Sequence, residues 1–136
     1  MLPTHGFNAL LGLELQGSQN GDYVLELLIG PGHLNEAGGV HGGVYLSLLD
    51  TVMARAGRMN QGPDLYLPTL ELKTNFLGSV NSGRIIAKGR VISRTRRTCY
   101  AEGELMSDAG KLLARGSCTM ITVEARATPE KPSEAG

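Results

Sequence analysis

The chain has 136 residues, of which 41% are hydrophobic and 19% are charged. This length allows one domain with one hydrophobic core and is too short for two. Thirteen acidic and thirteen basic side chains give a formal net charge of zero, so no excess of positive charge points to nucleic acid.

No apolar run reaches the roughly 20 residues that a membrane-spanning helix requires, and the opening sequence MLPTHGFNAL lacks the pattern of a signal peptide. We therefore expect a cytoplasmic protein without a membrane partner. Cys99 and Cys118 are too few and too far apart for a disulfide framework or a four-ligand zinc site. We expect both to be reduced thiols in the core.

Two runs of alternating apolar residues open the chain and predict a β-hairpin. Leu11, Leu13 and Leu15 alternate along the first run, and residues 23–29 alternate along the second. A turn around Gly21 joins the two predicted strands.

A glycine-rich segment and a helix follow the hairpin. Residues 30–43 contain six glycines and one proline, which predicts an irregular loop. Residues 44–57 contain no proline and carry apolar side chains on nearly every face, so the predicted helix should be buried all round. Prolines and a glycine in residues 58–68 then break regular structure.

Four further runs with a period of two predict four strands separated by turn-forming segments: residues 70–77, 84–92, 98–106 and 111–123. Small residues share one face of the last two runs and would let a helix lie close: Cys99, Ala101 and Gly103, then Ala114, Gly116 and Cys118, with Leu105, Leu112 and Met120 on the same faces. The predicted fold class is α+β, a six-stranded antiparallel sheet curled around one long central helix, in the order β-β-α-β-β-β-β. This domain covers residues 1–124, and residues 125–136, with two prolines and no large apolar residue, are predicted to be a disordered tail.

Asp50 is the one carboxylate of the predicted helix, and its neighbours within one turn are apolar except for Ser47 and Thr51. Burying a carboxylate among them is costly, which favours a functional role over a satisfied structural carboxylate. Gly42 and Gly43 stand at the start of the helix, where backbone N–H groups and the helix dipole can stabilise charge on a carbonyl oxygen during acyl transfer. Either glycine could instead serve only a turn.

Asp50 lies eight residues beyond Gly42, which places them about 12 Å apart along one helix. One reacting carbonyl cannot touch both groups at that separation, because each contact spans only ~3 Å. If both groups act together, they must come from different chains, as in a dimer of antiparallel helices.

The segment HGGVYLSLLD resembles the H-G-G-x6-[D/E] motif of hotdog-fold acyl-CoA thioesterases of the phenylacetate-pathway and hydroxybenzoyl-CoA kind. Further segments agree with this family over roughly residues 7–123: His33-Leu34-Asn35, TLELKTNFLGSV, VISRTRR and GKLLARGSCTMITV. The resemblance implies a hotdog domain, an acyl-CoA substrate, no cofactor, and a homodimer with active sites shared between subunits. A homotetramer built from such dimers is also expected, with its packing face left open.

The resemblance also assigns roles by position. It implies that the Gly42 N–H binds the thioester carbonyl, while Asp50 of the partner subunit is the general base or the nucleophile. Asn35 matches the Asn or Gln that holds the carbonyl or the attacking water in that family. Thr69 falls where related enzymes place a small hydroxyl residue near the carboxylate.

Other residues are expected to support the site. Gly43, His41 and His33 would support the oxyanion site and its loop, and the histidines lack metal-ligand spacing, so no metal is expected. The sequence departs from the family at Ala54, where the hydroxybenzoyl-CoA branch has threonine, and at Thr95, where many members have glycine. The first departure argues against the substrate of that branch.

Arg94, Arg96 and Arg97 surround a predicted hairpin turn and are candidates for CoA binding. Arginine binds phosphate through paired, charge-assisted hydrogen bonds, and in the resembling enzymes this hairpin lies near the nucleotide end of CoA. A solvated charged face is the alternative.

The predicted function is hydrolysis of an aromatic or medium-chain acyl-CoA to the free acid and CoA. A thiol with a pKa near ~8.5 leaves as the thiolate without a strong general acid, and no G-x-S-x-G elbow is present. Acyl specificity would depend on the pocket around residues such as Tyr45, Leu49, Met53 and Phe76. Two alternatives stay open: a hotdog-fold dehydratase or hydratase, and a non-catalytic acyl-CoA-binding module in which Asp50 is structural.

Overall fold

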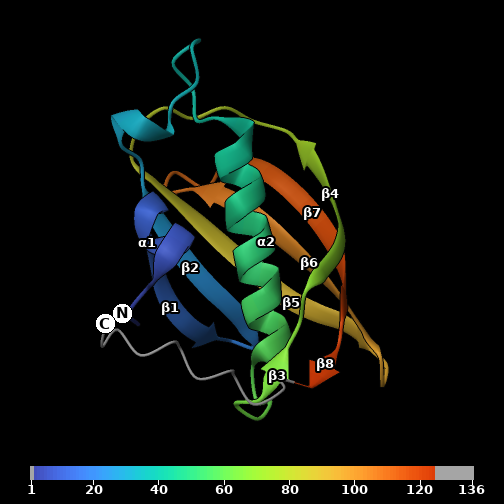
Figure 1. Ribbon diagram of the computed structural model, residues 1–136. Coiled ribbons are helices and arrows are strands. Elements are labelled where there is room, and N and C mark those ends of the chain that lie inside the picture. Colours follow the sequence, from blue (N-terminus) through green and yellow to red (C-terminus); the bar gives the residue numbers. More distant parts are fainter. Residues whose placement is uncertain (1, 125–136) are drawn as a thin grey trace, which may run out of the picture.

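One antiparallel sheet of six strands wraps around a single long helix in the computed structural model, which describes residues 2–124 (Figure 1). The elements are α1 (Gly6–Leu11), β1 (Leu13–Gln19), β2 (Asp22–Leu28), the short helical turn η1 (Pro31–His33), α2 (Gly42–Arg58), β3 (Leu65–Tyr66), β4 (Thr69–Phe76), β5 (Arg84–Arg94), β6 (Thr98–Ser107), β7 (Leu112–Ile121) and β8 (Val123–Glu124). The strand order is β1-β2-β5-β6-β7-β4, so β1 and β4 are the edges. The predicted α+β architecture is confirmed, and the predicted tail lies outside the described residues.

The helix α2 packs against the concave face of the sheet through one broad apolar face. Its buried residues are Val44, Tyr45, Leu48, Leu49, Val52, Met53, Ala56 and Gly57. Each large apolar side chain buried in this way contributes about 1.5–3 kcal/mol relative to exposure. The prediction of a helix buried all round is wrong, because the sheet covers one side only and leaves Leu46, Asp50 and Ala54 at least partly accessible.

A row of three glycines lets α2 lie close to the sheet. Gly89, Gly103 and Gly116 are in register across β5, β6 and β7. A Cβ atom at Gly89 would lie 2.7 Å from the Val52 carbonyl oxygen, and one at Gly103 would lie 3.2 Å from Leu49. The prediction that small residues on the later strands accommodate the helix is therefore confirmed.

The boundaries of several elements differ from the prediction. Leu11 ends the short helix α1 rather than opening a strand, and β1 begins at Leu13. An irregularity in the β6–β7 pairing between Leu105 and Met106 places Leu113, rather than Leu112, in the core. A bulge of this kind shifts the alternation of faces by one residue.

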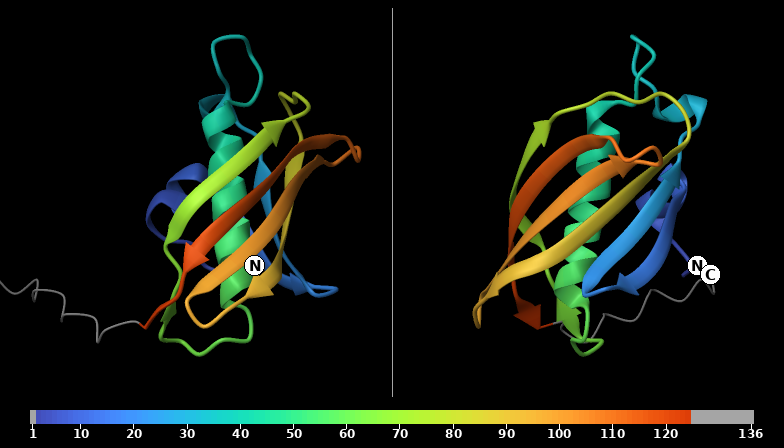
Figure 2. Two further views of the ribbon diagram at one scale, coloured as in Figure 1. Left: turned by 90° about the vertical axis from the view of Figure 1, so that its right-hand side faces the viewer. Right: turned by 180° about the vertical axis from the view of Figure 1, so that it is seen from behind.

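Figure 2 shows that α1 and α2 both lie on the concave side of the sheet, with the opposite face of the sheet uncovered. None of the helices within residues 2–124 is both long enough and apolar enough to cross a membrane.

Candidate active site

Asp50 lies at the middle of α2, on the side turned away from the sheet core, and is half-buried. The hydroxyl of Thr69, the first residue of β4, donates a hydrogen bond of 2.7 Å to Asp50 Oδ1. Within residues 2–124 this is the one hydrogen bond to the Asp50 carboxylate. A carboxylate held through one oxygen keeps the other oxygen available to accept a proton or to attack.

The start of α2 presents one open backbone donor. His41 caps the helix, because its Nδ1 accepts a hydrogen bond of 2.8 Å from the Gly43 N–H. The Gly43 amide is therefore engaged, whereas no acceptor among the described residues takes the Gly42 N–H. Of the two amides predicted to polarise a carbonyl, the structure leaves Gly42 free to do so.

The ring of Phe76 lies directly over Gly42. A Cβ atom at Gly42 would meet Phe76 Cε1 at 3.3 Å, so a larger residue at this position would push the ring outward by a few tenths of an ångström. Phe76 stacks on Tyr45, with ring centroids 6.1 Å apart, and remains 54% exposed. Any group bound at the Gly42 amide would lie beside this aromatic surface.

The glycine-rich loop before α2 is held by His33 and Asn35. His33 Nδ1 accepts from the Gly30 N–H at 2.9 Å, so its Nε2 carries the proton and donates to the Leu11 carbonyl at 2.7 Å. Asn35 Oδ1 accepts from the Ala37 and Gly39 N–H groups at 2.9 and 3.1 Å. The Asn35 oxygen is thus used within the loop, and its amide NH2 is the group that it can offer to a ligand.

The three arginines of the β5–β6 hairpin divide into two kinds. Arg94 Nη2 donates a hydrogen bond of 2.6 Å to the Gly57 carbonyl at the end of α2, where a cation is favoured by the helix dipole. Arg96 and Arg97 are exposed in the turn itself. Thr95 shapes this turn, because its hydroxyl accepts from the Arg97 and Thr98 N–H groups.

Cys99 and Cys118 are free and buried, which confirms the prediction of core thiols. Burial, followed by the nearby charge of Asp50, raises the pKa of the Cys118 thiol to about 12. Burial also raises the pKa of Cys99. Both are neutral thiols at ordinary pH and are not activated nucleophiles. No three His, Cys, Asp or Glu side chains within residues 2–124 are grouped so that they could hold a metal ion.

The four residues expected to line an acyl pocket differ in burial. Tyr45, Leu49 and Met53 point into the core and are almost completely buried. Phe76 is the one member of this group with a large accessible surface. Sequence reasoning missed this distinction, because helix residues facing the core and facing a ligand are both apolar.

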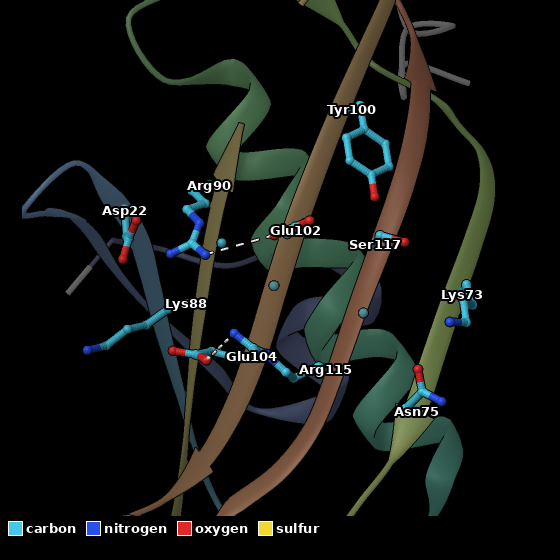
Figure 3. A pocket seen from close by; sticks show the side chains of 13 residues that line it. Asp22, Lys73, Asn75, Lys88, Arg90, Tyr100, Glu102, Glu104, Arg115 and Ser117 are labelled. Carbon is cyan, nitrogen blue, oxygen red and sulfur yellow. Dashed lines mark ion pairs between the residues drawn. The ribbon is translucent and has the colours of Figure 1, made fainter. Parts of the chain in front are cut away.

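A hollow of about 280 Å³ lies on the opposite, outer face of the sheet (Figure 3). Charged side chains of neighbouring strands line it, including the cross-strand ion pairs Arg90–Glu102 at 3.8 Å and Arg115–Glu104 at 3.7 Å. None of the predicted site residues lines this hollow. Asp50 and Gly42 lie instead on α2, on the helix side of the sheet, and both are partly accessible.

Three comparisons place this arrangement among known proteins. A model of the thioesterase superfamily matches residues 37–114, more than half of the chain. A 1,4-dihydroxy-2-naphthoyl-CoA hydrolase of Listeria monocytogenes is 25% identical over 89% of this chain and 98% of its own. A conserved protein of Pseudomonas aeruginosa superposes with a TM-score of 0.83 at 29% identity, over 88% of this chain and 95% of the other.

A structure described as a putative thioesterase, a phenylacetic acid degradation-related protein from Ralstonia eutropha, superposes with a TM-score of 0.80. It is 27% identical to this chain, and the match covers 88% of this chain and 92% of the other. These likenesses confirm the hotdog fold that the sequence predicted.

Proposed function

This chain belongs to the thioesterase superfamily, and we propose that it hydrolyses an aromatic or medium-chain acyl-CoA with Asp50 as its catalytic carboxylate. The hydrogen bond between Thr69 and Asp50 carries the proposal, because it holds a carboxylate in one orientation on the accessible side of α2. A purely structural aspartate would instead have its oxygens satisfied within the chain.

The chemistry requires a donor for the carbonyl and a carboxylate for the attack. The free Gly42 N–H, at the positive end of the α2 dipole, polarises the thioester carbonyl and stabilises the oxyanion. Asp50 either removes a proton from the attacking water or attacks the carbonyl carbon itself to form an anhydride that water then hydrolyses. In both routes the C–S bond breaks and CoA leaves as the thiolate.

The site is complete only in a homodimer, in this proposal. Gly42 and Asp50 are about 12 Å apart along the same helix, so the carbonyl bound at one Gly42 meets Asp50 of the partner subunit. The edge strand β4 supports this arrangement, because its exposed apolar residues Leu70 and Phe76, followed by Leu77, offer an unpaired surface next to Thr69. A homotetramer and a cytoplasmic location stay predictions from the sequence.

The arginines of the β5–β6 hairpin are the proposed CoA site, and they differ in role. Arg94 holds the end of α2 and is already bonded to Gly57, so Arg96 and Arg97 are the residues proposed to contact the phosphates. Both are exposed in a turn that Thr95 fixes, which lowers the entropy lost when they bind an anion.

Two observations support an aromatic acyl group as the substrate: the exposed ring of Phe76 and the substrate named for one relative. An exposed ring beside the Gly42 amide can stack on a planar acyl group. The Listeria relative is described as acting on a dihydroxynaphthoyl-CoA, which is a bicyclic aromatic thioester. Ala54, one turn after Asp50, leaves space on the accessible side of α2 for either kind of acyl group.

The direct test measures CoA release from acetyl-, octanoyl-, benzoyl- and phenylacetyl-CoA by the wild type, Asp50→Asn and Asp50→Ala. We expect kcat to fall at least ~100-fold in both variants, as for loss of a base or nucleophile. Asp64→Asn, which changes an exposed carboxylate of the 58–68 linker, is the matched control and should behave as the wild type. If the wild type binds these thioesters without releasing CoA, or the Asp50 variants match it, the proposal is wrong.

A further inference from the structure

The short helix α1 is unusual because it has an apolar surface but no buried residue. Asn8 and Leu11, one turn apart, face the rest of the molecule, and Leu11 packs against the core. Phe7 and Leu10, also one turn apart, are 59% and 81% exposed. Phe7 and Leu10 are therefore two neighbouring apolar side chains on the surface, outside the hydrophobic core.

Two hydrogen bonds place α1 beside the candidate active site. The hydroxyl of Thr51, the residue next to Asp50, donates to Asn8 Oδ1 at 3.3 Å. His33, in the loop that leads to Gly42, donates to the carbonyl of Leu11 at 2.7 Å. One residue of α2 therefore separates the catalytic carboxylate from α1, and consecutive Cα atoms are only about 3.8 Å apart.

Asp50 lies on α2, which is flanked by α1 and by β4. In Figure 2, α1 stands farther from the sheet than α2, on the concave side of the molecule. The accessible stripe of α2, which includes Asp50 and Ala54, thus lies between α1 on one side and β4 on the other. Phe7 of α1 and Phe76 of β4 are both exposed, so each flanking element carries an accessible aromatic ring.

We propose that Phe7 and Leu10 contact the distal part of the acyl group and select thioesters with an extended, apolar acyl group. This inference rests on the proposed thioesterase function, and it assigns α1 a role in specificity. Neither the Phe7 nor the Leu10 side chain can donate or accept a hydrogen bond. A hydroxyl or charge at the far end of the acyl group would lose water without gaining a partner there.

The test compares acetyl-CoA with octanoyl-CoA in the variant carrying both Phe7→Ser and Leu10→Ser. We expect kcat/KM for octanoyl-CoA to fall roughly tenfold through KM, because apolar contact with the acyl chain is lost. We expect the two-carbon acyl group of acetyl-CoA not to contact α1, so its kcat/KM should stay within about twofold of the wild type. Asn8→Ala, which removes the bond to Thr51, should shift the same ratio in the same direction by less.

Leu28→Ser is the control, because Leu28 is as exposed as Phe7 and lies at the end of β2, outside α1. It should leave both substrates unchanged. Because α1 has no buried residue, the double variant should unfold at the wild-type temperature, which a thermal melt checks. An unchanged octanoyl-to-acetyl ratio in the double variant overturns the role of α1 while leaving the thioesterase function intact. If the wild type releases no CoA, the thioesterase proposal fails, and calorimetric binding of the same two thioesters to the same variants then decides the role of α1.

Discussion

The two edge strands of the sheet, β1 and β4, differ in how far the rest of the chain covers them. At β1, the N-terminal segment covers part of the edge, because the Leu2 N–H donates to the Leu15 carbonyl at 2.9 Å. A bulge with Gly17 in the left-handed region then bends the strand, and the end of β1 is polar. At β4, six of eight residues are exposed, including Leu70 at 60% and Phe76 at 54%.

An edge strand that is long, apolar and unpaired invites another chain, whereas bulges and covering segments discourage pairing. The protected edge β1 carries none of the candidate catalytic residues. The open edge β4 begins with Thr69, which binds Asp50, and ends with Phe76, which covers Gly42. This contrast agrees with the proposed homodimer, in which β4 is the edge that meets the second subunit.

The largest expected effect comes from placing charge on the open edge. The double variant with Leu70→Asp and Leu77→Asp should not dimerise, because four added negative charges would face one another across each interface. Turnover should fall at least ~100-fold, since each Gly42 loses the carboxylate of the partner subunit. Sedimentation velocity and CoA release measure the two effects.

The same two charges placed on β1 provide the control for that experiment. Ser18→Asp with Gln19→Asp changes two exposed residues of the other edge and should leave both mass and turnover unchanged. A monomeric wild type with full activity, or a dimer lost through the β1 substitutions instead, would contradict the assignment of β4 as the interface.

A smaller effect is expected from Thr69→Val, which removes the hydrogen bond to Asp50 while keeping the shape of the side chain. A hydrogen bond to a charged group contributes about 1.5–3 kcal/mol, so kcat should fall roughly 10- to 100-fold with KM little changed. Thr69→Ser should restore most of the rate. Because Thr69 acts through Asp50, the loss should fall on kcat and not on KM, and a normal kcat in Thr69→Val would remove Thr69 from the site.

The smallest effect on activity is expected at the protected edge, where a substitution should change only stability. Gly17 has a φ of +96° and open space around a Cβ atom, so Gly17→Ala introduces backbone strain without a clash. We expect a loss of about 1–2 kcal/mol in the free energy of unfolding, measured in urea. Activity at a temperature where the variant is folded should equal that of the wild type. A large loss of turnover would show that β1 also contributes to the site.

Alternation of apolar residues was sufficient to predict six main strands and their sheet, because the pattern is local to each strand. It was not sufficient for α1, whose six residues are too few to form a stable helix without tertiary contacts. It also missed the shift at Leu112 and Leu113, because a bulge depends on the partner strand as well as on its own sequence.

The sequence by itself determined the candidate carboxylate, the glycines at the start of the helix and the spacing between them, since spacing along one helix is a local property. The second chain inferred from that spacing stays a prediction. Only the tertiary structure decided which candidate side chains are hydrogen-bonded within the chain and which can still bind a ligand. It joined Thr69 to Asp50 across 19 residues, bonded Arg94 to Gly57 across 37, and placed α1 beside Thr51 across 43. These contacts depend on how the sheet curls around α2, and that arrangement follows from packing between distant segments rather than from any one of them.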